Sequence, residues 1–234
     1  MSIQLIQEHI GSAEAQPMAL PPKPLLRGWS HGLAAAGAVC LTIALCWQSR
    51  GDPPRLFSMA IYGIALCELY TVSALYHIGM WNHARRRTLR ALDHANIFIF
   101  IAGTYTPLCF NILSGWLRIA LLSVIWLLAC TGVWLTLTRP HLPRRVGTIL
   151  YIGMGWVAIF ALPAFLTLLP WQATGLLLLG GLLYTIGGII YARRRPDPFP
   201  RVFGFHEVFH LFTIAAGIAF TVAIWAYALS FPRV

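Results

Sequence analysis

Two histidines four residues apart, His206 and His210, lie in the last long apolar stretch of the sequence. On an α-helix this spacing puts both side chains on one face, with Cβ atoms about 5–6 Å apart, so the two imidazoles can bind one metal ion. The pair is a weak signal in a soluble helix. In an apolar segment two unpaired imidazoles are costly, and a bound metal satisfies both, so the spacing favours a metal site.

A serine precedes a histidine by one turn in another apolar stretch, as Ser73-Ala-Leu-Tyr-His77. A metal-binding histidine commonly needs a polar partner nearby, which the Ser73 hydroxyl can supply. Taken alone, the pattern favours a serine that bonds back to its own helix. Asp93 also has a simple alternative explanation, since a carboxylate near the start of a helix is stabilised by the helix dipole.

The elements that position these side chains are expected to be membrane-spanning helices. The 234 residues are 58% hydrophobic and 10% charged, whereas soluble domains have about 25% charged residues. Seven apolar stretches approach the ~20 residues that cross a bilayer, and in lipid such stretches form helices. They cover residues 29–48, 57–80, 91–113, 116–137, 146–168, 172–192 and 205–231. The sequence therefore predicts an all-α integral membrane protein, a seven-transmembrane-helix bundle.

The distribution of Lys and Arg predicts the orientation of this bundle. Thirteen of the 17 lie in the N-terminal segment and in the connectors after the second, fourth and sixth stretches. The positive-inside rule then makes the N-terminus cytoplasmic and places the C-terminus outside, in what we expect to be the bacterial inner membrane. Because the charges form short clusters without a basic face or a nucleic-acid-binding motif, the expected partners are membrane lipids and not nucleic acid.

The N-terminal segment and the cysteines are not expected to take part in the chemistry of the site. Residues 1–26 are rich in proline and are expected to form a flexible cytoplasmic tail, with no cleaved signal peptide before the membrane domain at 27–234. The five cysteines lie in apolar runs without a CxxC pair, so they are interpreted as small apolar residues buried in the membrane and not as disulfides.

This orientation places ligand-type side chains from three spans at one membrane depth. His77 lies near the cytoplasmic end of the second span, and Asp93, His206 and His210 lie near the cytoplasmic starts of the third and seventh. Three histidines with a carboxylate or a water form a known zinc arrangement that keeps an open position. The sequence thus predicts one shared site.

Four motifs together resemble the bacterial haemolysin III family, which belongs with the adiponectin and progestin receptors (PAQR proteins). The motifs are Glu68 followed by Ser73-Ala-Leu-Tyr-His77, Arg90-Ala-Leu-Asp93-His94-Ala-Asn-Ile-Phe, Ile101-Ala-Gly-Thr-Tyr-Thr-Pro107 and Phe203-Gly-Phe-His206-Glu207-Val-Phe-His210. The resemblance runs from about residue 25 to the end. It implies a seven-helix fold with a zinc ion held by His77, His206 and His210. It also implies that Ser73 and Asp93 support the metal or its water.

The leading functional hypothesis is a zinc-dependent membrane hydrolase of lipid amides (ceramidase-like) or esters. Zinc lowers the pKa of a bound water to about 7 and polarises a carbonyl, and Asp93 would accept the water proton or hold the water. One alternative is a haemolysin-type membrane-lytic or channel protein, although the spans lack the polar stripe of an aqueous pore. Another is a receptor or sensor with a structural zinc.

The other ionisable residues of the spans are expected to play lesser roles. Glu207 follows His206 but points about 100° away from it on a helix, which predicts packing or a supporting hydrogen bond. Glu68 either lines a substrate cavity or pairs with a neighbouring helix. The remaining histidines are interpreted as interfacial or solvated: His9, His31, His83, His94 and His141.

Overall fold

The computed structural model describes residues 23–139 and 143–232, and within these ranges it contains helices and no β-strand. Seven helical segments are long and apolar enough to cross a membrane, which confirms the all-α class and the seven spans. The helices are α2 (Trp29–Gln48), α3 (Pro53–Ile78), α4 (His83–Ile112), α5 (Gly115–Thr138), α6 (Arg144–Trp156), α7 (Leu162–Leu168), α8 (Trp171–Arg193) and α9 (Phe205–Ala223), with a 3-10 turn η1 (Val157–Ala161) and a π-helical turn η2 (Ile224–Ala228).

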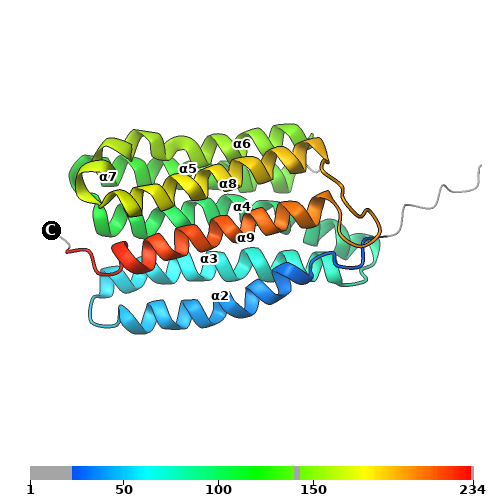
Figure 1. Cartoon of the computed structure of the whole chain (residues 1–234), viewed down its shortest axis with the longest axis horizontal. Coiled ribbons are helices and arrows are strands. Elements are labelled where there is room, and N and C mark those ends of the chain that lie inside the picture. The colour runs from blue at the N-terminus through cyan, green and yellow to red at the C-terminus, as the bar shows by residue number, and fades with distance from the viewer. Residues whose placement is uncertain (1–22, 140–142, 233–234) are drawn as a thin grey trace, which may run out of the picture.

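The helices lie side by side in one bundle, with α2, α3 and α9 next to one another and α5, α6 and α8 on the other side of α4 (Figure 1). Helix α4 is the central one, because 78% of its most apolar window is buried, against 17–50% for the other spans. It carries Asp93, while its neighbours α3 and α9 carry the predicted histidines. The fold thus gathers the candidate residues around the central helix.

Two polar side chains cap the starts of α3 and α4. The carboxylate of Asp52 accepts a hydrogen bond from Arg55 N and caps α3, whose first residue is Pro53. The side chain of Asn82 accepts from Arg85 N and caps α4. Capping of this kind satisfies backbone N–H groups that have no partner inside the helix. Helix α3 ends at Ile78, with His77 in its last turn.

The fifth span is interrupted, whereas the sequence predicts one stretch over 146–168. After α6 the chain forms the 3-10 turn η1 before α7 continues to Leu168. The hydroxyl of Tyr105 from α4 enters this break. It donates to the carbonyl of Gly155 at 2.6 Å and accepts from the N–H of Ala158 at 2.6 Å. A side chain from the bundle interior thus satisfies backbone groups freed by the interruption, as a membrane requires.

Glycines on α8 permit close contact with α9. A Cβ atom at Gly180 would lie 2.6 Å from the Phe220 ring, and one at Gly187 would lie 3.0 Å from the Cβ of Phe212. Small residues let membrane helices approach closely. This contact holds α9, which carries His206 and His210, against α8.

The segment before α2 is attached to the connector before α9. The N–H groups of Leu25 and Leu26 donate to the carbonyls of Arg201 and Val202, each at 3.1 Å. Most of the predicted tail, residues 1–22, lies outside the described residues. The five cysteines are free thiols; Cys109 is buried inside the bundle, whereas Cys40 and Cys130 are exposed on its surface. The side of the membrane on which each terminus lies stays a prediction.

Candidate metal centre

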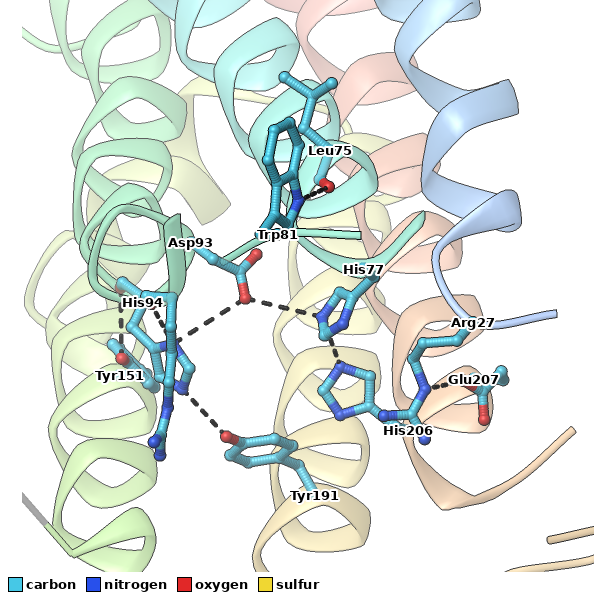
Figure 2. A network of polar contacts seen from close by, with 11 residues as sticks. Arg27, Leu75, His77, Trp81, Asp93, His94, Tyr151, Tyr191, His206 and Glu207 are labelled. Atoms are coloured by element: carbon cyan, nitrogen blue, oxygen red, sulfur yellow. Dashed lines mark hydrogen bonds and ion pairs between the residues drawn. The ribbon is translucent and has the colours of Figure 1, made fainter. Parts of the chain in front are cut away.

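Three histidines from two helices meet at one end of the bundle. His77 lies in the last turn of α3, and His206 and His210 lie in the first two turns of α9. The Nε2 atoms of His77 and His206 are 3.0 Å apart, as Figure 2 shows for these two rings. One nitrogen from each of the three histidines lies within 4.8 Å of the other two. This is the trio that the sequence predicts as metal ligands.

The donor set suits a zinc ion. His77 is 7% exposed and His210 is 1% exposed. No hydrogen-bond partner reaches the buried Nδ1 of His210 from the described residues. Burying an imidazole nitrogen without a partner is costly, and zinc is bound well by three neutral imidazoles with a fourth position left open. The residues present therefore fit zinc, with His77, His206 and His210 as the groups that would hold it.

Asp93 reaches this cluster from the central helix. One carboxylate oxygen, Oδ2, lies 3.7 Å from His77 Nε2 and 3.9 Å from His94 Nδ1, as Figure 2 shows. Ser73 on α3 lines the same cavity as Asp93. Because α4 begins at His83, Asp93 is not in its first turn, so the alternative explanation from the helix dipole is wrong. Asp93 instead lies beside the histidine cluster, and Ser73 lines the adjoining cavity.

His94 differs from its interpretation as an interfacial or solvated residue. Its Nδ1 lies 2.8 Å from the Arg90 carbonyl, and its Nε2 lies 3.1 Å from the Tyr191 hydroxyl on α8. Tyr151 on α6 donates to the His94 carbonyl at 3.2 Å. His94 therefore links the central helix to α8 beside the cluster (Figure 2). The sequence offered no signal for either tyrosine.

The interpretation of His31 as interfacial or solvated is wrong. His31 is 3% exposed, because its side of α2 packs against α3 and α9 and not against the membrane surface. Its ring stacks on His210, with centroids 3.8 Å apart and planes at 10°. His83 is exposed, as expected. His9 and His141 lie outside the described residues.

The two glutamates of the motifs have different surroundings. Glu207 is 1% exposed, forms an ion pair with Arg27 (Figure 2), and accepts from Gly204 N at 2.7 Å. This confirms its supporting role, which is to hold the start of α9. Glu68 is exposed on α3 and does not line the cavity next to the histidines. In the described part of the chain its carboxylate has no recorded ion pair, so neither predicted role for Glu68 is found.

A cavity of about 190 Å³ begins at the histidine cluster and runs into the bundle. Ser73, Asp93, His206 and His210 line its polar end. Most of its remaining walls are apolar and come from α4, α6, α8 and α9, as far as Phe165 on α7. The polar end can therefore contact a reacting group while the apolar part encloses a hydrocarbon chain.

The comparisons with known proteins agree with this architecture. The family described as Haemolysin-III related matches residues 21–221. A Hemolysin-3 homolog of Bacillus subtilis (strain 168) is 30% identical over 182 residues, which are 78% of this chain and 82% of that protein. Hemolysin-3 of Bacillus cereus is 30% identical over 202 residues, or 86% and 89% of the two chains. An adiponectin receptor protein of Drosophila melanogaster is 30% identical over 146 residues, or 56% and 33%. This chain belongs to the haemolysin III family of integral membrane proteins, with the adiponectin receptors as more distant relatives.

Proposed function

We propose that this protein is a zinc-dependent hydrolase of lipid amides or esters in the bacterial inner membrane. The observation that carries the proposal is the position of three histidine nitrogens within 4.8 Å of one another at the head of a mainly apolar cavity. Histidine clusters without a cavity suit structural sites. A cluster that opens into a cavity gives a substrate access to the metal's open position.

The residues of the site have two roles, binding the metal and accepting a proton. His77, His206 and His210 would hold the zinc. When bound, zinc supplies a Lewis acid that lowers the pKa of a water and polarises a carbonyl. Asp93 lies beside a ligand ring, with Oδ2 at 3.7 Å from His77 Nε2, and accepts a proton from water at this oxygen.

Ser73 and Glu207 keep this arrangement in place. Ser73, one turn before His77, lines the cavity with Asp93 and would support its carboxylate with a hydroxyl group. The ion pair of Glu207 with Arg27 fixes the first turn of α9, which carries His206. Small errors in the position of a reacting group cost large factors in rate, so both supports matter for turnover.

The cavity favours a lipid as substrate. Ile97, Phe100 and Leu177 are among its apolar wall residues, and burying an acyl chain there contributes about 0.8 kcal/mol per CH₂ group. The amide or ester linkage then lies at the polar end, next to Asp93. A water-filled conduit would need polar walls along its length, so the cavity does not favour the channel alternative.

The proposal is tested by lipid hydrolysis in defined vesicles. Purified protein is reconstituted with a ceramide, and separately with a diacyl ester lipid, and released fatty acid is measured by mass spectrometry. We expect release by wild type and by the control His83→Ala, whose side chain is exposed, and no release by His206→Ala. A zinc-loaded wild-type protein that hydrolyses neither lipid would contradict the proposal and favour a receptor or sensor with a structural zinc.

A further inference from the structure

We infer that His31 is a positioning residue of the metal centre, which sets the orientation of the His210 ring by parallel stacking. This inference rests on the proposed metal centre and extends it to a further helix, α2. His31 and His210 are separated by most of the chain, but their ring centroids lie 3.8 Å apart with the planes at 10°. Both rings are almost completely buried, at 3% and 1% exposure.

The angles between the rings separate His31 from the ligand trio. His77, His206 and His210 meet one another at interplanar angles of 58–69°, so their edges and nitrogens converge. The ring of His31 instead lies face to face with His210, and His31 does not belong to the group whose nitrogens lie within 4.8 Å. His31 therefore contacts a ligand and is not arranged as one.

Tyr70 on α3 also contacts the His31 ring. The two ring centroids are 5.1 Å apart, with the planes at 53°. A Cβ atom at Gly217 would lie only 2.5 Å from the Tyr70 hydroxyl. The absence of a side chain at Gly217 thus makes room for Tyr70 two turns along α9 from His210. His31 thus packs against Tyr70 of α3 and His210 of α9, and these contacts restrict the movement of its ring.

The ring face of His31 makes the contact with the His210 ring. In the described part of the molecule neither ring nitrogen of His31 has a hydrogen-bond partner by geometry, which is costly for a buried imidazole. A metal ion on His210 withdraws electron density from that ring. The electron-rich face of the His31 ring then attracts the electron-poor His210 ring, as in a cation–π contact. The stack is therefore strongest when the metal is bound.

The experiment compares two substitutions that fill the space of His31. His31→Phe keeps a planar ring and removes both nitrogens, and His31→Leu removes the planar ring. Phe98→Leu is the matched control, because it exchanges a buried ring at the contact between α4 and α5. Gel filtration and thermal unfolding first establish that each variant is folded. Zinc affinity is then measured by competition with a chromophoric chelator, and ligand geometry by the visible spectrum of the Co²⁺-loaded protein.

We expect His31→Leu to weaken zinc binding by about 10- to 100-fold, the usual effect of losing a residue that orients a ligand, and to change the Co²⁺ spectrum. His31→Phe and Phe98→Leu should keep the wild-type affinity and spectrum. The inference is overturned if His31→Leu binds as wild type does, or if His31→Phe loses as much as His31→Leu, since a nitrogen is then required. A folded wild-type protein that binds no zinc overturns the proposed function together with this inference.

Discussion

The Nε2 atoms of His77 and His206 lie 3.0 Å apart, although 129 residues separate them in the chain. The contact joins the last turn of α3 to the first turn of α9. Two neutral imidazoles at this distance share one proton, with one nitrogen donating and the other accepting. A metal ion instead uses the lone pairs of both, and His210 adds a third donor. This relationship is the geometric basis of the proposed centre.

Replacing Asp93 by asparagine should separate metal binding from turnover. Asn keeps the size of the side chain but cannot accept the proton, so lipid hydrolysis should fall by about 10²–10⁴-fold, while zinc content stays at the wild-type level. Fatty-acid release and elemental mass spectrometry on the same preparation measure both quantities. Turnover by Asp93→Asn at the wild-type rate would show that the carboxylate is not the proton acceptor.

Removing the partner of Glu207 should destabilise the protein. In Arg27→Ala the carboxylate of Glu207, which is 1% exposed, stays buried without its cation. Breaking a buried ion pair in this way costs about 3–5 kcal/mol. Thermal unfolding in detergent measures the loss, and Arg85→Ala is the control because its side chain is exposed. Equal unfolding temperatures for the two variants would mean that the ion pair does not hold α9 in place.

The hydroxyl of Tyr105 should stabilise the interrupted span. Tyr105→Phe removes the bonds to Gly155 O and Ala158 N and leaves two partly buried backbone groups without these partners, at about 1–3 kcal/mol. For a chain of this size the midpoint falls by about 2–4 °C per kcal/mol. Tyr227→Phe is the control, since that hydroxyl forms no hydrogen bond with the described residues. A midpoint for Tyr105→Phe equal to that of the control would argue against this role.

Two glycine substitutions test the contact between α4 and α5. A Cβ atom at Gly132 would lie 2.3 Å from the Phe98 ring, whereas one at Gly153 would meet nothing within 4 Å. Gly132→Ala should therefore destabilise the protein by about 1–3 kcal/mol, as overpacked cores do, and Gly153→Ala should not. Denaturant or thermal unfolding of both variants measures the difference. If Gly132→Ala is as stable as Gly153→Ala, the two helices are not closely packed at this point.

Much of the fold follows from the sequence because lipid leaves the backbone few options. An apolar stretch of span length must be helical, so six of the seven spans are predicted to within about four residues, whereas α4 begins at His83, ahead of the predicted start at 91. The break in the fifth span is different, since Tyr105 supplies its hydrogen bonds from another helix. Pro163, at the start of α7, was the local signal that could have indicated it.

The site was predictable where ligand-type residues lie at the same depth in the membrane. His77, His206 and His210 are costly in a membrane and lie near span ends of the same side, so a shared site follows. His31 was not predictable, because its place near the start of the first span also suits an interfacial residue. The position of Glu68 was not predictable for a similar reason. Hydropathy does not tell which face of α3 points into the bundle, and the Glu68 side chain lies on an exposed face.

The measurement that tests the central claim most directly is the metal content of detergent-purified protein by elemental mass spectrometry. Wild type is compared with His77→Ala and His206→Ala, which remove ligands from α3 and α9 respectively. The proposed centre predicts about one zinc per wild-type chain, as for a single three-histidine site, and its loss in both variants. A folded wild-type protein without bound zinc, or zinc retained in both variants, would contradict it.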